Sequence, residues 1–200
     1  MCIRDSTQAA LISVHFAADG QRGWAVGTDG TILATGDGGN VWTPQTSGTG
    51  AQLNSVHFAA DGQRGWAVGT DGTILATGDG GNVWTPQTSG TWELLFSVQF
   101  TADGQRGWAV GSGGTILTTG NGGKAWTPQT SGTEAWLSSA QSTADGQRGR
   151  AVGGVRAVPP TRARGGRGAA LRPAHPLRAP WRRATPARPG GPPHGAWGTG

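Results

Sequence analysis

Short stretches of alternating apolar and polar residues recur along the chain, separated by glycine-rich segments. In SVHF, at 13–16, Val14 and Phe16 alternate with polar neighbours, as in a strand with one buried face. Three further strand-like stretches follow: WAVGT at 24–28, TILAT at 31–35 and VWTPQ at 41–45. The pattern therefore predicts a unit of four short strands. Pro44 in the fourth lacks an amide hydrogen, which predicts that this strand lies at a sheet edge.

The dipeptide Asp29-Gly30 predicts how the second and third strands pair. It is typical of a two-residue hairpin turn in which both residues take positive φ. This turn would place one set of side chains together on one face and a second set on the other (Trp24 and Val26 with Leu33; Ala25 and Gly27 with Ile32 and Ala34). Both faces are then largely apolar, as in a sheet packed between two others.

The four-strand unit repeats every 42 residues. The tryptophan of GQRGW recurs at Trp24, Trp66 and Trp108, and Arg150 takes its place in a fourth copy. Residues 13–49 return unchanged at 55–91, and the third copy, 97–133, differs at eight of 37 positions. This period suits a four-stranded propeller blade. The predicted fold is all-β, a partial β-propeller of four-stranded antiparallel blades, with blades at 11–52, 53–94 and 95–136 and a truncated blade at 137–153.

The segment TGDGGNVW, at 35–42 and again at 77–84, fits the Asp-box (bacterial neuraminidase repeat) pattern Ser/Thr-x-Asp-x-Gly-x-x-Trp. The wider phrase WAVGTDGTILATGDGGNVWTPQTSG resembles repeats of the photosystem II assembly/stability-factor family of β-propellers and its bacterial relatives. The resemblance covers about residues 11–153. It implies that SVHF lines the central channel. Because three blades leave two apolar faces bare, the chain is expected to be a fragment of a longer propeller. The resemblance also favours an extracytoplasmic location, which the sequence itself leaves undetermined.

The Asp-box residues are interpreted as structural. The carboxylates of Asp37 and Asp79 can accept amides exposed by the Gly-Gly turn, and Asn121 can still accept in the third copy. The tryptophans of the motif are expected to pack across each blade (Trp42, Trp84 and Trp126). No catalytic set is expected, because the chain has no tyrosine for a sialidase-type nucleophile and its two glutamates occupy non-equivalent connector positions.

Neither a metal nor a cofactor is predicted. GDGGN is similar to calcium loops, yet calcium needs six to eight oxygen ligands, and tandem calcium repeats have a nine-residue period. Turn chemistry explains the same glycines and aspartate. His15 and His57 are interpreted as solvated strand histidines, because the third copy has Gln99 at their position, and glutamine does not replace a metal-binding histidine.

One arginine per copy recurs in DGQRG and forms the best candidate for binding a partner (Arg22, Arg64, Arg106 and Arg148). A ring of guanidinium groups could bind a carboxylate-rich protein or an acidic glycan. The alternative is that each arginine is a surface residue paired with the aspartate of its own loop, a contact worth little energy.

The two ends of the chain differ from the repeats. Residues 1–6, MCIRDS, resemble the translated transposon mosaic-end adapter of sequencing libraries and are interpreted as an adapter-derived leader. Residues 154–200 are rich in Arg, Pro, Gly and Ala, which predicts a disordered tail and a frameshift product. The alternative is a genuine Arg-Gly tract that binds nucleic acid.

Charge separates this tail from the repeats. Residues 7–149 have a net charge of −5, whereas 150–200 contain ten arginines and no acid. The basic character therefore predicts no nucleic-acid binding by the propeller. No apolar run is long enough to span a membrane. The predicted function is a non-enzymatic protein-binding scaffold, part of an assembly-factor-like propeller. The alternative is the non-catalytic propeller part of a secreted carbohydrate-active protein.

Overall fold

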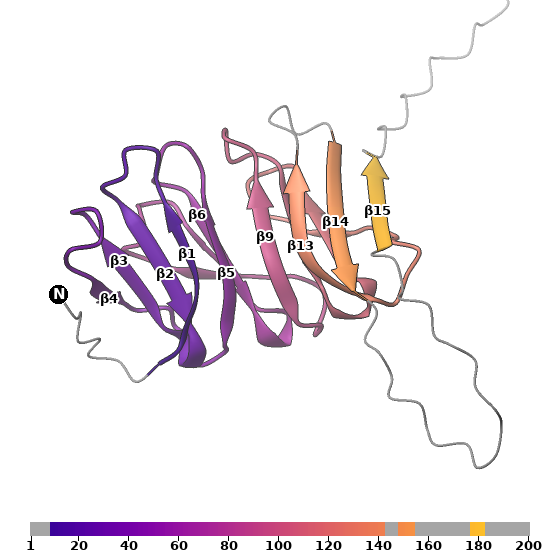
Figure 1. Ribbon diagram of the computed structural model, residues 1–200, viewed down its shortest axis with the longest axis horizontal. Coiled ribbons are helices and arrows are strands. Elements are labelled where there is room, and N and C mark those ends of the chain that lie inside the picture. The colour runs from indigo at the N-terminus through magenta and orange to yellow at the C-terminus, as the bar shows by residue number, and fades with distance from the viewer. Residues whose placement is uncertain (1–8, 143–147, 155–176, 183–200) are drawn as a thin grey trace, which may run out of the picture.

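The structure, a computed structural model, describes residues 9–142, 148–154 and 177–182. Three four-stranded sheets follow one another along its long axis (Figure 1). The first contains β1 (Leu11–Phe16), β2 (Gly23–Gly27), β3 (Ile32–Thr35) and β4 (Thr43–Gln45). The second contains β5 (Leu53–Phe58), β6 (Gly65–Gly69), β7 (Ile74–Thr77) and β8 (Thr85–Gln87). The third contains β9 (Leu95–Phe100), β10 (Gly107–Gly111), β11 (Ile116–Thr119) and β12 (Thr127–Pro128).

Within each sheet the strands pair antiparallel in chain order. The first strands of successive units lie side by side: β1 contacts β5, β5 contacts β9, and β9 contacts β13 (Trp136–Ser142). The last strands, which contain Pro44, Pro86 and Pro128, lie at the opposite edge, as their missing amide hydrogens predict. The prediction of an all-β partial propeller with four-stranded antiparallel blades is confirmed.

The predicted register of β2 and β3 is wrong by one residue. Asp29 and Gly30 do take φ of 55° and 67° in the turn η1 (Thr28–Gly30). However, the amide of Gly27, not that of Thr28, donates to the Thr31 carbonyl, because the Thr28 amide donates to Ala10. Gly27 and Thr28 therefore both oppose Thr31, which is a β-bulge. This places Trp24 and Val26 opposite Ala34 and Ile32, and Ala25 opposite Leu33.

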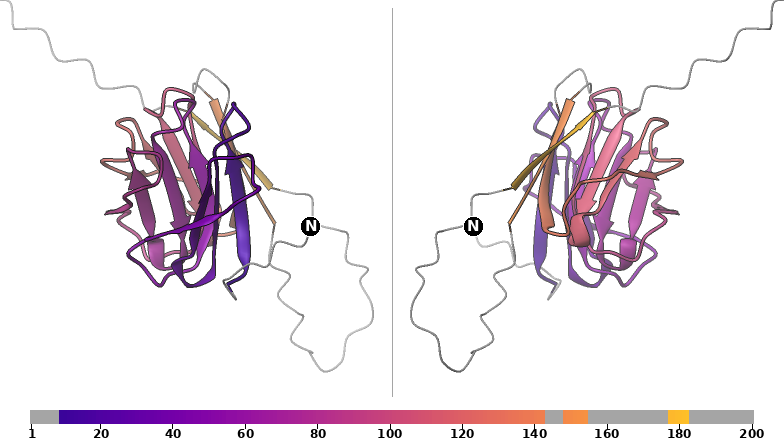
Figure 2. Two further views of the ribbon diagram at one scale, coloured as in Figure 1. Left: turned by 90° about the vertical axis from the view of Figure 1, so that its left-hand side faces the viewer. Right: turned by 90° about the vertical axis from the view of Figure 1, so that its right-hand side faces the viewer.

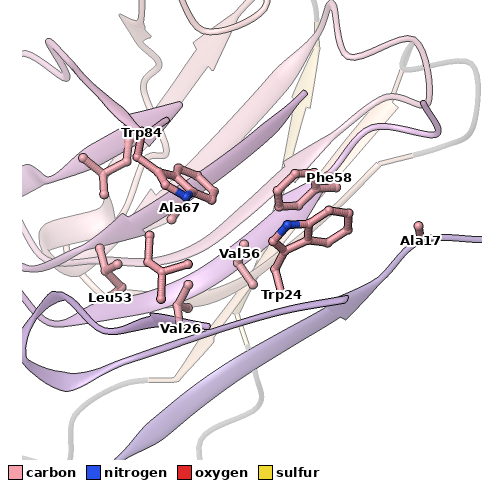
Figure 3. Packing of buried hydrophobic residues seen from close by; sticks show 10 residues of the cluster. Ala17, Trp24, Val26, Leu53, Val56, Phe58, Ala67 and Trp84 are labelled. Carbon is pink, nitrogen blue, oxygen red and sulfur yellow. The ribbon is translucent and has the colours of Figure 1, made fainter. Parts of the chain in front are cut away.

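Each blade packs one face against the opposite face of the next blade. The face with Trp24, Val26 and Ile32 meets the face of the second blade that contains Leu53, Val56, Phe58, Leu75 and Trp84 (Figure 3). The Trp24 ring stacks on Phe58 with centroids 3.5 Å apart and an interplanar angle of 11°. Trp66 stacks on Phe100 in the same way, at 3.5 Å and 7°. The core is therefore a series of repeated layers between blades.

A serine hydrogen bond joins the inner strands of neighbouring blades. The Ser13 hydroxyl oxygen accepts the amide of Val56 at 3.3 Å, and Ser55 accepts that of Val98 at 3.2 Å. Ser97 accepts the amide of Ala140 at 3.3 Å. An inner strand has no sheet partner on its channel side, so these bonds satisfy amides that would otherwise be unpaired.

The first blade exposes the face that the second blade buries. Figure 2 (left) looks onto this side of the molecule, where no other sheet among the described residues covers it. Val14 and Phe16 are 57% and 41% exposed, while their counterparts Val56 and Phe58 are 5% and 3% exposed. Because 37 residues of the two copies are identical, the difference arises entirely from the neighbouring blade.

Within the described residues, the fourth unit contains three strands. β13 pairs with β14 (Arg148–Gly154), and β14 pairs with β15 (Leu177–Arg182). The expectation of disorder over 154–200 therefore does not hold for Leu177–Arg182, which gain backbone partners along an open strand edge. The rest of that tail, apart from Gly154, and the leader at 1–6 lie outside the described residues.

Phe58 and Phe16 provide a direct test of inter-blade packing, because their sequence surroundings are identical and only their burial differs. We expect Phe58→Ala to lower the free energy of unfolding by about 3–5 kcal/mol, the usual loss for a buried aromatic. Phe16→Ala should lower it by roughly 1 kcal/mol or less, as at other exposed sites. Urea unfolding followed by tryptophan fluorescence measures both, and equal losses would show that the stacks do not stabilise the fold.

Candidate functional site

The loops that connect the strands lie along two opposite edges of the row of blades, which we call the arginine end and the connector end. The arginine end contains two kinds of loop: the DGQRG loops (17–22, 59–64 and 101–106) and the Asp-box loops (36–42, 78–84 and 120–126). The two kinds contact each other in the first blade, where the amide of Gly38 donates to the carbonyl of Gln21 at 2.8 Å. The connector end contains the hairpin turns η1, η2 (Thr70–Gly72) and η3 (Ser112–Gly114) and the connectors between blades (46–52, 88–94 and 130–135). Turn and connector contact each other here, because the amide of Gly72 donates to the backbone carbonyl of Glu93 at 3.0 Å.

At the arginine end, the structure places one arginine of each described blade in an equivalent loop position. Arg22 Nε donates to Asp19 Oδ2 at 2.9 Å, and Arg64 Nε donates to Asp61 at 2.8 Å. Both arginine side chains remain 37% exposed. Arg106 occupies the same place in the third blade, and the side chain of Arg148 lies outside the described residues. The structure therefore brings together three of the four predicted arginines, two of them as ion pairs within their own loops.

Arg22 also reaches the next blade. Its Nη1 donates to the carbonyl of Gly62 at 3.2 Å, so the guanidinium bridges two DGQRG loops. Asp19 holds the base of the side chain and also accepts the amides of Gln21 and Arg22 at 2.9 and 3.1 Å. These amides, that of Arg22 first, lower the pKa of Asp19 to about 2. These contacts hold the Arg22 guanidinium in one orientation beside the Asp19 carboxylate. They use Nε and Nη1, and Nη2 makes no hydrogen bond among the described residues.

The Asp-box acceptors close the second set of loops at this end. Asp37 Oδ1 accepts the Thr35 hydroxyl at 2.8 Å and the Val41 amide at 3.0 Å. Asp79 makes the same pair of contacts at 2.8 and 3.1 Å, and Asn121 makes them at 2.9 and 3.0 Å. An amide oxygen therefore closes this loop with the same geometry as a carboxylate.

The Asp-box loop also binds the preceding blade, a connection that sequence reasoning missed. The indole of Trp24 donates to the carbonyl of Gly80 at 2.8 Å, and that of Trp66 donates to Gly122 at 3.1 Å. A Cβ at Gly81 would lie 2.9 Å from the Trp24 indole nitrogen, so the glycine permits this approach. The 56-residue separation of donor and acceptor gave no local signal in the sequence.

The Asp-box tryptophans are less uniform than the motif. Trp84 is 6% exposed and meets Phe58 edge-on, with ring centroids 5.9 Å apart. Trp42 and Trp126 are half-buried. The indole nitrogens of Trp84 and Trp126 are buried without a hydrogen-bond partner among the described residues. Trp84 and Trp126 each meet a phenylalanine of their own blade edge-on and also lie in the apolar layer against the preceding blade. The GQRGW tryptophans add a hydrogen bond to the next blade.

A row of polar side chains follows the inner strands. His15, His57, Gln99 and Gln141 occupy equivalent positions and line a hollow of about 570 Å³ with the serines of the same strands. The interpretation of the histidines as solvated is wrong: both are half-buried, with ring centroids 4.9 Å apart. Burial first, and then the charge of His15, lower the pKa of His57 to about 4.

The described residues contain no group of three or more His, Cys, Asp or Glu side chains arranged to hold a metal ion. No helix within the described ranges is long and apolar enough to cross a membrane.

Asp79 tests what the Asp-box acceptor requires. Asp79→Asn should keep most of the stability at neutral pH, because Asn121 already performs this role, whereas Asp79→Ala should lower the urea midpoint by leaving the Val83 amide without its acceptor. The hydrogen bonds to Asp79 lower its pKa, so its contribution is present above the unfolded pKa and disappears as pH falls. Asp79→Asn should therefore also reduce the loss of stability in acid. Equal midpoints for both variants at neutral pH would contradict the interpretation.

His57 predicts a second acid response. A lowered pKa in the folded state means that protonation favours unfolding, so stability is complete above the unfolded pKa and falls as pH drops towards 4. Between pH 7 and 5 the loss should be on the order of 2 kcal/mol. His57→Gln, which copies Gln99, should remove that loss. His15→Gln is the control and should remove less; urea unfolding at both pH values that shows no difference among the three proteins would refute the assignment.

Sequence and structure comparisons agree on the relatives of this chain. The family described as photosynthesis system II assembly factor YCF48 matches residues 2–88 and, overlapping them, 47–131. Comparison with curated proteins finds no match. Among solved structures, YCF48 bound to D1 peptide is 26% identical over 74% of this chain and 50% of that chain, with a TM-score of 0.61.

Two more distant structures share the fold. YCF48 from Cyanidioschyzon merolae is 23% identical over 76% of this chain and 52% of its own, with a TM-score of 0.61. An ancestral GH74 enzyme is 15% identical over 72% of this chain and 22% of its own, with a TM-score of 0.60. The chain spans about half the length of both YCF48 structures. The family match, which extends over more than half of the sequence, together with this fold shows that the chain belongs to the family of the photosynthesis system II assembly factor YCF48.

Proposed function

We propose that the chain is a non-enzymatic, protein-binding part of an assembly-factor-like β-propeller, and that its arginine end holds an acidic segment of the partner. The observation that carries this proposal is the array of arginines on one end of the stack, half-exposed and fixed in direction by their own aspartates. Membership of the YCF48 family supports a scaffold role, and a related structure contains a bound peptide.

The geometry favours a partner that bridges neighbouring blades. Arg22 already bonds to a carbonyl of the next DGQRG loop, which shows that a guanidinium at this position reaches across the blade boundary. An extended peptide could therefore meet one arginine after another. A carboxylate of such a peptide would compete with Asp19 or Asp61 for the guanidinium and form charge-assisted bonds to its remaining donors.

Absence of catalysis is part of the proposal. The aspartates of the arginine end are engaged with loop amides, hydroxyls and arginines, and the glutamates lie at the connector end. The alternative, a propeller part of a carbohydrate-active protein, stays a prediction, because the GH74 likeness at 15% identity shows the fold alone.

Peptide binding by arginine variants tests the proposal. The probe is a fluorescein-labelled decapeptide of alternating Glu and Ser, and fluorescence anisotropy measures its affinity for the full chain in 50 mM salt. We expect Arg64→Gln to weaken binding roughly three- to tenfold, the effect of one lost charge-assisted contact at a half-exposed site. Adding Arg22→Gln should weaken binding further.

Lys124→Gln is the matched control, because it removes one positive charge from an Asp-box loop of the same end but not from the arginine array. The Arg-rich segment 150–200 also attracts an acidic probe, so differences between variants decide the result and the wild-type affinity alone does not. Equal affinities for Arg64→Gln and Lys124→Gln, with unchanged unfolding midpoints, would overturn the proposal.

A further inference from the structure

The connector end carries exposed aromatic and aliphatic side chains that the repeat does not require. Trp92 is 86% exposed, Leu94 is 41% exposed and Trp136 is 44% exposed. At the equivalent places in the connector between the first two blades, the chain has Gly50 and Gln52. That connector closes the same kind of blade, so the fold does not need apolar residues here. Large side chains held in solvent at one place mark a contact surface.

Backbone hydrogen bonds bring these residues to one region around η3. The carbonyl of Leu94 accepts the amide of Ser112 at 2.9 Å, and that of Ala135, next to Trp136, accepts the amide of Gly114 at 3.0 Å. The two connectors therefore flank the same turn. The ring of Trp136 also contacts Phe96, with centroids 5.5 Å apart. We call Trp92, Leu94, Phe96 and Trp136 the aromatic patch.

The charged residues of the hairpins and connectors at this end have one sign. The hairpins and connectors of this end, over 28–31, 46–52, 70–73, 88–94, 112–115 and 130–135, contain four acids and no Lys or Arg (Asp29, Asp71, Glu93 and Glu134). In the third hairpin Gly113 replaces the aspartate of the other two, and the Glu93 carboxylate lies over it, 3.5 Å from where a Cβ would be. The Ser112 hydroxyl donates to that carboxylate. A negative charge therefore remains at the third hairpin, although its source has changed.

We propose that the connector end docks a protein segment that combines apolar side chains with lysine or arginine. Exposed tryptophans supply large contact area at a small cost in side-chain entropy and are enriched at the energetic centres of interfaces. The surrounding carboxylates select cations and disfavour an acidic segment. This surface lies opposite the arginine end, so the two ends would hold chemically different segments. The inference rests on the proposed scaffold function and adds the chemistry of a second contact.

Three labelled peptides test the proposed chemistry. The probe is Gly-Lys-Leu-Ser-Lys-Leu-Gly-Lys-Leu-Ser; one comparison peptide replaces every Leu by Ser, and the other replaces every Lys by Glu. We expect the full chain to bind the probe at least tenfold more tightly than the peptide in which Ser replaces Leu, in anisotropy titrations at 150 mM salt. The peptide in which Glu replaces Lys also meets the arginine end and the Arg-rich segment, so its affinity is compared only between variants. The Arg-rich segment 150–200 repels the probe, so it cannot supply this binding. Equal affinities for the probe and for the peptide in which Ser replaces Leu would overturn the role of the aromatic patch.

Variants that copy the first connector locate the binding surface. Trp92→Gly with Leu94→Gln installs the residues of Gly50 and Gln52 and should weaken probe binding at least tenfold with little change in the unfolding midpoint. Val83→Ala is the control, because Val83 is 59% exposed at the opposite end and the third copy has Ala125 there; it should leave affinity within twofold. Wild-type affinity in the double variant would refute the proposal.

A charge variant keeps the test decisive if the double variant unfolds. Glu134→Lys changes one exposed connector residue and should weaken the probe while strengthening the peptide in which Glu replaces Lys. If neither affinity changes, the carboxylates around the aromatic patch have no role in binding and the proposal fails. The arginine variants described above should leave probe binding unchanged. Arginine variants that bind the acidic peptide as tightly as the Lys124→Gln control would therefore reject the arginine end without rejecting the aromatic patch.

Discussion

The fold depends on one contact that recurs from blade to blade, in which a tryptophan of one sheet stacks on a phenylalanine of the next and donates its indole hydrogen to an Asp-box carbonyl. Trp24 and Trp66 make this contact with Phe58 and Phe100 at the same 3.5 Å centroid separation. The stack is apolar, whereas the hydrogen bond is directional. The first contributes burial and the second fixes the angle at which the next blade lies. Because the acceptor carbonyl sits in a loop closed by the Asp-box side chain, the local motif and the inter-blade contact depend on each other.

This arrangement explains why contacts with a partner can lie at the arginine end and the connector end. The facing sides of neighbouring blades bury each other, and serines of the preceding blade accept inner-strand amides at the blade boundaries. Loops at the two ends carry fewer packing duties, so their residues can vary without loss of the core. At the arginine end the variation is small and each loop repeats an Arg–Asp unit. At the connector end the copies diverge, from Gly50 to Trp92 to Glu134 at one position. Repetition suits an extended partner, and divergence suits a single docking point.

The sequence was sufficient for the architecture because its signals are local and repeated. A 42-residue period, strand-length alternation, a DG turn and a strand proline each follow from backbone chemistry, and each agreed with the structure. The register of β2 and β3 was not predictable in the same way, because the Thr28 amide leaves the hairpin to bond with Ala10, a residue outside it. The burial of His57 was missed for a related reason: the neighbouring inner strand buries it. The link from Trp24 to Gly80 crosses a blade boundary and has no sequence signature.

The two identical copies show where the stabilising energy of a repeat protein lies. Residues 13–49 and 55–91 have the same sequence and the same strand pairing, yet Val14 is 57% exposed and Val56 is 5% exposed. Local interactions are therefore equal in the two blades, and the burial supplied by the preceding blade is the only large difference. In a stack of this kind, stability is a sum of units and of nearest-neighbour interfaces. A residue whose exposure changes between copies contributes to stability through the interface between blades. A residue such as Trp92, whose identity changes while the fold around it stays the same, is free to be selected for a contact outside the chain.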